Sequence, residues 1–298
     1  MTDTNSIDQK KRQDHVPTVS IGMPVYNGER YLREALDSIL LQTFSDFELI
    51  ISDNASTDGT RSICEEYMLQ DNRIRYFLQP VNKGASWNFR FVLDQSCGEY
   101  FMWAAADDWR FPNFIDDAMR SYQIDPSLLC VQGSIDFMVG TRSIFRLNSA
   151  KIFKHGSHIS FFFARELYGK CMLMYGLFKK KSLYKADWTQ LQGEKNWWWN
   201  DTLFLYSLLS EGGMAFMQFP SMRYLLKTTK KDRQYASVTS VKRSALLGLI
   251  SFHPLSYYAD YLSLTPSRQR ICIALAVPFK MVKATIEAWF FYAYKRRK

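Results

Sequence analysis

Two adjacent carboxylates, Asp107 and Asp108, stand directly after a nearly continuous apolar run at residues 100–106. Polar segments at residues 24–29 and 52–60 also follow apolar runs. Carboxylate oxygens are ligands that Mg²⁺ and Mn²⁺ favour, and a divalent cation in turn suits a phosphate-bearing ligand. The pattern therefore predicts a pocket for a metal-bound nucleotide. The alternative is a strand-end turn whose acids are simply solvated.

The elements that must position these residues are visible in the hydrophobic pattern. Apolar runs at residues 18–23, 47–51, 74–78 and 100–105 predict strands, and the segments between them carry apolar residues at helical spacing. Asn27 is a candidate cap for the first helix, which would carry Leu32, Leu36 and Ile39 on one face. This alternation predicts an α/β doubly wound sheet, with the polar segments at the carboxyl ends of its strands.

The pattern loosens after Asp108. Pro112 is expected to begin a helix that runs to about Tyr122, and residues 128–131 predict a short strand. Segments 160–168, 199–209 and 214–219 predict helix, helix and strand. We expect these elements to complete the domain that the first strands begin.

Positive charge is concentrated in the last quarter of the chain. The whole chain carries a net charge of +9, whereas residues 227–298 hold 14 Lys or Arg against three acids. That quarter therefore has a net charge of +11, and the rest of the chain has −2. Such a distribution favours contact between the C-terminal region and an anionic partner.

The segment 271–294 is mostly apolar but contains Pro278, and Lys280, Lys283 and Glu287 share one helical stripe. Residues 295–298 are all basic. Three charges near the middle of the segment disfavour a bilayer span. An amphipathic helix lying in the membrane interface, with its basic end on anionic lipid, fits better. The alternative is a helix packed against the protein itself or against another subunit.

Composition argues against several classes of protein. The five cysteines are odd in number and form no C-x-x-C pair, which argues against a disulfide framework or a thiolate metal site. Residues 1–16 are polar and lack the apolar stretch of a secretory signal, so we expect a flexible leader and a cytoplasmic protein. Nucleic-acid binding is not expected, because the positive charge sits beside an apolar tail and no base-reading module is apparent.

Five segments in one order resemble the family 2 glycosyltransferases, which have the GT-A fold. They are residues 19–27, 42–49, 53–60, 82–84 and 98–100, the last leading into Asp107 and Asp108. The resemblance implies a GT-A-type doubly wound mixed sheet flanked by helices, followed here by the C-terminal amphipathic helical extension. It also implies an inverting transfer of a sugar from a nucleotide diphosphate to an acceptor hydroxyl, assisted by Mg²⁺ or Mn²⁺.

Positions that match the family's motifs carry its expected binding roles. The resemblance implies that Asp53 accepts a hydrogen bond from the base and that Lys83 lies near the phosphates. The plainer alternatives are that Asp53 closes a turn, that Tyr26 fills a gap at the sheet edge and that Lys83 is an ordinary solvated lysine. In full, the implied nucleotide contacts are Pro24, Tyr26, Glu29, Asp53, Lys83 and Asp107, and the implied metal contacts are Asp107 and Asp108.

Asp201 matches the acid that the family uses as catalytic base, and it precedes an apolar helix. A carboxylate near the anomeric carbon can take the proton of the acceptor hydroxyl. Glu194 and Asp187 are the next candidates, and a helix cap is the alternative role for Asp201. The tryptophans at 197–199 could shape an acceptor pocket, pack in the core or contact lipid. The basic segment 227–235 could close over the pyrophosphate or be a solvated linker.

One position departs from the family pattern. Many members carry an acid where this chain has Ala105. A non-catalytic nucleotide- or glycan-binding protein on the same fold is therefore one alternative. A nucleotidyltransferase is another, but the segment after the first strand lacks the glycine-rich, basic phosphate loop expected there.

The expected organisation has three parts. Residues 1–16 form a leader, residues 17–226 form the catalytic domain, and residues 227–298 form a basic loop and a helical, membrane-associating region. Within the catalytic domain, residues 17–115 would bind the nucleotide and residues 116–226 would face the acceptor. The expected setting is the cytoplasmic face of the membrane, with a cell-surface polysaccharide or lipid-linked glycan as acceptor.

Overall fold

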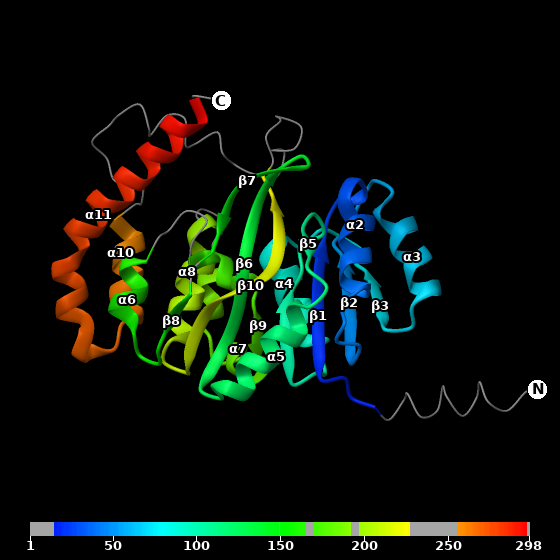
Figure 1. Ribbon diagram of the computed structural model, residues 1–298, viewed down its shortest axis with the longest axis horizontal. Coiled ribbons are helices and arrows are strands. Elements are labelled where there is room, and N and C mark those ends of the chain that lie inside the picture. Colours follow the sequence, from blue (N-terminus) through cyan, green and yellow to red (C-terminus); the bar gives the residue numbers. More distant parts are fainter. Residues whose placement is uncertain (1–14, 149, 165–169, 192–196, 227–254, 297–298) are drawn as a thin grey trace, which may run out of the picture.

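The computed structural model describes residues 15–148, 150–164, 170–191, 197–226 and 255–296. Its strands form one sheet flanked by helices, and the C-terminal helices stand at the opposite end of the molecule from α2 and α3 (Figure 1). Glu194, nearly all of the expected leader and the basic segment 227–235 lie outside the described residues.

The first half is the predicted alternation of strand and helix. Four parallel strands stand in the order β3 (Ile74–Leu78), β2 (Phe47–Asp53), β1 (Val19–Val25) and β4 (Tyr100–Trp103). The connecting helices are α2 (Glu29–Leu40), α3 (Thr60–Gln70) and α4 (Ala85–Asp94). Every residue of β2 is buried, as expected for a strand covered on both faces. The strands and helices predicted before residue 105 are therefore confirmed.

The second half makes the sheet mixed. After α5 (Phe114–Ile124), β6 (Leu128–Val139) runs far beyond the short strand expected at residues 128–131. β9 (Leu177–Lys179) lies antiparallel between β4 and β6, and β10 (Gly213–Leu225) pairs in parallel with β6. The other elements are β5 (Trp109–Arg110), β7 (Arg142–Leu147), β8 (Lys151–Phe153), α6 (His158–Phe163), η1 (Lys170–Tyr175), α7 (Lys180–Leu183), η2 (Trp188–Leu191) and α8 (Trp197–Leu208). The main path of the sheet reads β3-β2-β1-β4-β9-β6-β10-β5.

Two C-terminal helices pack against this second half. α10 (Leu255–Leu264) contacts α8, and α11 (Ser267–Arg296) contacts both α6 and α10. Tyr261 of α10 is fully buried, and its ring centroid lies 4.5 Å from that of Tyr206 in α8. The Tyr206 hydroxyl in turn forms a hydrogen bond of 2.6 Å with Thr265 Oγ1. The predicted C-terminal helix is confirmed, whereas α10 is an element that the sequence pattern did not indicate.

Trp103, the last residue of β4, stands at the centre of an aromatic core. Its ring is fully buried and meets the rings of Phe101, Phe178 and Phe204 edge to face, at centroid distances of 4.9, 5.8 and 6.2 Å. Its indole Nε1 donates to the carbonyl oxygen of Phe89 at 3.0 Å, so its single donor is satisfied. This packing fixes the end of β4, where the loop with the two adjacent acids begins.

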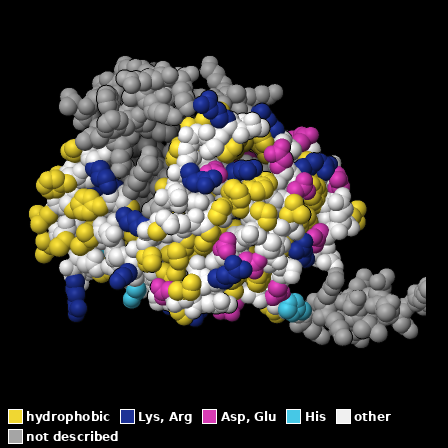
Figure 2. Space-filling model, viewed as in Figure 1, with side chains coloured by type: hydrophobic (Ala, Val, Ile, Leu, Met, Phe, Trp, Pro, Cys, Tyr) yellow, Lys and Arg dark blue, Asp and Glu magenta, His cyan; other side chains and the backbone are white. Residues whose placement is uncertain are grey.

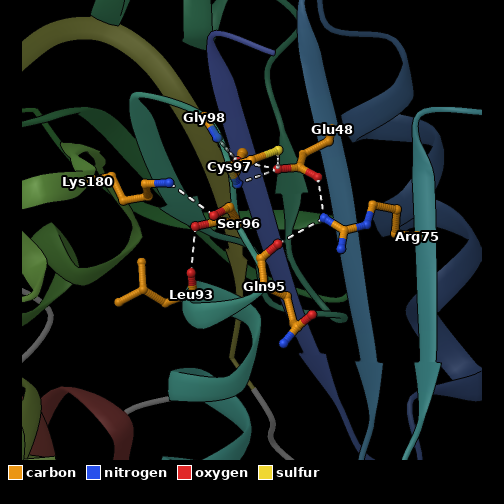
Figure 3. Close-up of polar contacts among 9 residues, drawn as sticks. Glu48, Arg75, Leu93, Gln95, Ser96, Cys97, Gly98 and Lys180 are labelled. Atoms are coloured by element: carbon orange, nitrogen blue, oxygen red, sulfur yellow. Dashed lines mark hydrogen bonds and ion pairs between the residues drawn. The ribbon is translucent and has the colours of Figure 1, made fainter. Parts of the chain in front are cut away.

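Glu48 ties together the amino ends of β1, β2 and the segment before β4 (Figure 3). Its Oε1 accepts hydrogen bonds from Ser20 Oγ at 2.6 Å and from Cys97 N at 2.8 Å, and its Oε2 accepts one from Arg75 Nη1 at 2.8 Å. Burial raises the pKa of this carboxyl, but the hydrogen bonds from Cys97, Ser20 and Arg75 outweigh burial and hold the pKa below its usual value. The ionised form of Glu48 is therefore favoured by the fold.

We expect Glu48→Gln to lower the free energy of unfolding by about 2 kcal/mol at neutral pH, because a buried set of charge-assisted hydrogen bonds is weakened. A lowered pKa means that the stability contributed by Glu48 is complete above about pH 4.5 and is lost as the pH falls through the folded-state pKa. The variant should therefore lose less stability on acidification than the parent protein. Urea denaturation at several pH values measures both effects.

The control for this experiment is Glu66→Gln, which removes the carboxylate of an exposed ion pair with Arg33. Exposed pairs contribute little to stability, so the control should change the unfolding curve much less. Equal losses in the two variants would contradict the role given to Glu48.

Candidate functional site

The loops with candidate chemistry begin side by side at the carboxyl edge of the parallel strands. Val25, the last residue of β1, lies opposite Asp53, the last residue of β2. Asn54 N donates to Val25 O at 2.9 Å, and Ala104 N, just past β4, donates to Gly22 O at 2.9 Å. The expectation that three polar loops share one edge of the sheet is therefore confirmed.

Reciprocal hydrogen bonds join the loop after β1 to the loop after β2. Asn27 N donates to Ser56 Oγ at 2.8 Å, and Thr57 N donates to Asn27 Oδ1 at 2.8 Å. Gly59 N donates to Glu29 Oε2 at 3.0 Å. The two loops thus form one cross-linked unit, in which Glu29 already holds the neighbouring loop.

Two residues in this unit adopt left-handed backbone conformations without being glycine. Asn27 has a φ of 51° and Ala55 a φ of 62°. Such conformations cost on the order of 1 kcal/mol for an alanine and persist only where the surroundings hold them. α2 begins at Glu29 with Gly28 as its N-cap, so the expectation that Asn27 caps this helix is wrong. Asn27 is used instead to bind Thr57.

Asp53, the last residue of β2, is fully buried. Its Oδ1 accepts a hydrogen bond from Ser56 N at 2.8 Å, and its Oδ2 accepts one from the Tyr76 hydroxyl at 3.0 Å. Burial raises the pKa of Tyr76, and the negative charge of Asp53 raises it further. The turn-closing role considered for Asp53 is therefore real, and contact with a nucleotide base stays a prediction.

The other expected nucleotide contacts border the same edge. Pro24 lies within β1 and Tyr26 follows it, and both are half-buried. Lys83 is exposed, its backbone N donates to Asn54 Oδ1 at 3.0 Å, and its ammonium lies 4.1 Å from the centroid of the Trp87 ring. Lys83 is thus anchored beside the loop after β2.

The acidic pair lies between β4 and β5. Asp107 is partly exposed, whereas Asp108 is only 6% exposed and accepts a hydrogen bond on Oδ1 from Leu225 N at 3.2 Å. Leu225 is the last residue of β10, far along the chain from the acidic pair. Asp108 is therefore held by the second half of the sheet, which a simple solvated turn does not explain.

The acidic loop also touches the loop after β1. A Cβ added to Gly28 would lie 3.4 Å from the Cβ of Ala106, the residue directly before Asp107, and 2.7 Å from Val25 Cγ2. The two backbones can approach this closely because position 28 has no side chain. The acidic pair and the loop that carries Tyr26 consequently belong to one site.

Arg110 lies buried two residues beyond the acidic pair. Its Nη2 donates to the carbonyl oxygens of Trp103 at 3.0 Å and of Tyr175 at 2.8 Å. Burial lowers the pKa of the guanidinium to about 10, and the negative charge of Asp108 opposes that shift. Arg110 therefore stays positively charged at neutral pH. Its two hydrogen bonds hold the acidic loop to the end of β4 and to η1.

Tyr175, the last residue of η1, accepts a hydrogen bond from Arg110 on its carbonyl oxygen and so links η1 to the acidic loop. Burial raises the pKa of its phenol, and the charges of Asp108, Asp201 and Asp107 raise it further, in that order. η1 packs against α8, which carries Asp201. Through Arg110 and η1, the acidic loop is thus connected to the helix that carries Asp201.

Asp201 lies inside α8, which includes residues 197–200 before it. It is therefore not an N-cap, and that alternative is wrong. Burial raises the pKa of Asp201 to about 7. Asp187, a second candidate base, accepts hydrogen bonds on Oδ1 from Thr189 N at 3.1 Å and from Thr189 Oγ1 at 2.5 Å, which closes the turn into η2.

Sequence reasoning missed Arg110 and Tyr175. Arg110 had a local signal, a basic residue two positions after the acidic pair. Tyr175 had none, because its place beside the acids depends on how η1 packs against α8 and receives Arg110.

The acidic pair offers a cation two carboxylate groups of the hard-oxygen type that Mg²⁺ and Mn²⁺ bind. Within the part of the chain that the structure describes, no group of three or more His, Cys, Asp or Glu residues could hold a metal. The residues present therefore fit a cation that is shared with the oxygens of a bound ligand and with water, rather than one enclosed by protein.

Comparison with solved structures identifies the fold. The chain is similar to S. aureus TarS residues 1–349 in complex with UDP, with a TM-score of 0.57 and 16% identity over 94% of this chain and 92% of that one. It is also similar to a mannosyltransferase from Pyrobaculum calidifontis in complex with GDP-Man and Mn²⁺, with a TM-score of 0.55 and 15% identity over 95% and 76%. Both likenesses show the fold alone, which is that of the GT-A glycosyltransferases.

Curated sequence relatives match about a third of this chain. An uncharacterized glycosyltransferase of Rickettsia typhi is 39% identical over 106 residues, which is 36% of this chain and 32% of that protein. Glycosyltransferase GlyA of Streptococcus pneumoniae is 34% identical over 110 residues, 36% of this chain and 16% of that protein. The match thus spans a third or less of these relatives.

The family model described as Glycosyl transferase family 2 matches residues 20–180. That span contains the cross-linked loops after β1 and β2, the acidic pair, Arg110 and Tyr175, and it is more than half of the 298 residues. The protein therefore belongs to glycosyl transferase family 2.

Proposed function

We propose that this glycosyltransferase moves a hexosyl group, with inversion, from a nucleotide-diphosphate sugar to an acceptor hydroxyl. The observation that carries the proposal is the link between the acidic loop and the helix of Asp201: Arg110, two residues past Asp108, binds the carbonyl oxygen of Tyr175, and η1, which ends at Tyr175, packs against α8. A donor bound by the pair would leave its anomeric carbon near Asp201, where an acceptor can approach from the opposite side. Residues 17–115 would supply the donor half and residues 116–226 the acceptor half.

The donor would lie along the carboxyl edge of β1, β2 and β4. Tyr26 and Pro24 would border the base and ribose, with Asp53 as hydrogen-bond acceptor for the base and Glu29 beside them. Asp53 is fully buried, with one hydrogen bond to each of its oxygens, so a base would reach it only after a local displacement of the residues around it. Lys83, on the rim, is available to a phosphate.

Asp107 and Asp108 would hold Mg²⁺ or Mn²⁺ together with the donor's diphosphate, and Asp107 would also contact the nucleotide. A cation bound there would stabilise the negative charge that develops on the leaving diphosphate. The buried charge of Arg110 would keep the acidic loop in one arrangement while the ligand is absent.

Asp201 would act as the base that takes the proton of the acceptor hydroxyl. An ordinary aspartate is a weak base at neutral pH, whereas burial raises the pKa of Asp201 to about 7 and so strengthens it. A raised pKa is suited to a proton acceptor and supports the enzymatic proposal over a binding protein that has lost turnover.

The proposed acceptor is a growing cell-surface polysaccharide or a lipid-linked glycan, reached at the cytoplasmic face of the membrane. Support comes from residues 227–298, which contain 14 Lys or Arg residues but only three acids, and which include a mostly apolar helix. Anionic lipid attracts such a region, and lipid-linked acceptors are found at the same surface.

We expect Asp107→Asn and Asp108→Asn each to lower turnover at least about a hundredfold, because the stabilisation of the leaving diphosphate is lost. A screen of nucleotide sugars for metal-dependent release of free diphosphate gives the parent rate. Calorimetry with UDP and Mn²⁺ should show weaker binding in both variants. Asparagine keeps an oxygen for Leu225 N, so the urea midpoint of the Asp108 variant reports whether folding is intact.

Asp94→Asn is the control, because Asp94 forms an exposed ion pair with Arg90 on α4, away from the acidic loop. It should retain both activity and metal-dependent binding. Full turnover in the Asp108 variant at saturating donor and metal would overturn the assignment of the acidic pair.

We expect kcat/KM to rise with pH up to about 7 and then level off, because Asp201 accepts a proton only when it is ionised. Asp201→Asn should remove most of the activity and also the rise of kcat/KM below about pH 7, which is the acid limb of the profile. Asp187→Asn is the control and should retain the limb. A normal pH profile in the Asp201 variant, or its loss in the Asp187 variant, would move the role of base to another residue.

A further inference from the structure

α11 presents an apolar face to solvent along its N-terminal half. Ile271, Leu275, Phe279 and Val282 are 73%, 72%, 74% and 61% exposed. Their spacing of four, four and three residues places them on one side of the helix. Figure 2 shows hydrophobic side chains gathered at the left edge of the molecule, where α11 lies in Figure 1, with Lys and Arg side chains around them.

The opposite side of α11 is fastened to the catalytic domain. Ile273 is fully buried, and Ala276 and Val277 pack against the same hydrophobic cluster. Lys280 is also fully buried, and its Nζ donates to the carbonyl oxygen of Ala164, just past α6, at 3.0 Å. A lysine that would be costly to bury alone thus binds a helix C-terminus, and it fixes which side of α11 faces outward.

Positive charge borders the outward face. Arg268 and Arg270 are exposed at its beginning. Lys283, next to Val282, is also exposed, but its Nζ donates to the carbonyl oxygen of Phe163 at the end of α6. An apolar face with a cationic border matches an anionic lipid bilayer, which has an apolar interior and negatively charged headgroups.

We propose that the outward face of α11, formed by Ile271, Leu275, Phe279 and Val282, lies in the headgroup region of an anionic lipid bilayer while Lys280 holds the helix to the catalytic domain. The proposal rests on the proposed function in one respect, namely that the acceptor is reached at a membrane. It goes further by naming the side chains that enter the lipid and by fixing the orientation of the catalytic domain on it.

Among the described residues, no helix has both the length and the apolar character needed to cross a bilayer.

A second copy of the chain is a less suitable occupant of this face than lipid. A second copy of the chain would bring like charges, such as those of Arg268 and Arg270, together. A stable dimer also needs about 800 Å² buried per partner, more than four side chains on one helix supply.

The test compares flotation of the full-length protein with vesicles of phosphatidylcholine alone or mixed with phosphatidylglycerol. The parent protein should bind the anionic vesicles and bind neutral ones much less. The double variant Leu275→Glu, Phe279→Glu should bind at least about a hundredfold more weakly, since each apolar side chain withdrawn from lipid is worth roughly tenfold. Ile124→Glu is the control, at an isolated apolar side chain that is 83% exposed on α5.

Undiminished binding by the double variant would overturn the proposal, as would equal binding to neutral and anionic vesicles. The proposal would also be overturned if the parent protein did not bind vesicles but formed dimers, and the double variant did not form them. That result would assign the face to self-association. Hydrolysis of a nucleotide sugar without vesicles is measured in parallel. Intact hydrolysis without vesicle binding refutes the lipid face alone, whereas binding without hydrolysis refutes the proposed transfer alone.

Discussion

The constraint on which the rest of the structure depends is the parallel pairing of β1 with both β2 and β4. Ser20 lies opposite Glu48 on one side and Phe101 on the other, so the three strands are held in one register. A shift by one residue would turn buried side chains such as Ile21 toward the wrong face. Glu48 secures this register at the amino ends, and at the carboxyl ends the same register brings together the loops with Tyr26, Asp53 and the acidic pair.

A second constraint joins the two halves of the domain. Arg110 carries a charge into the interior, where it would be costly without partners, and it binds the carbonyl oxygens of Trp103 in β4 and Tyr175 in η1. Asp108 is linked to the end of β10 through Leu225. The metal-binding candidates therefore depend on residues from both halves, although the family motifs that indicate them lie almost wholly in the first.

Hydrophobic periodicity was sufficient to predict the first half of the fold, because each strand there is a local apolar run. It was insufficient for β9, whose three residues carry almost no pattern and whose place depends on β4 and β6. The acidic pair stood out through its local spacing, whereas Tyr175 became visible only through packing. Lys280 is another residue that the sequence pattern misplaced. The pattern puts it on the polar side of a helix, whereas in the fold it is buried against the end of α6.

The left-handed conformations of Asn27 and Ala55 have a consequence for ligand binding. Both loops are held in these unfavourable conformations by each other's hydrogen bonds, so their shape is set before any ligand arrives. Little backbone entropy would then remain to be lost when a ligand binds to these loops, and more of the contact energy would be left as affinity. Preorganisation of this edge is thus a property of the empty protein, and it comes from strain that the fold has already absorbed.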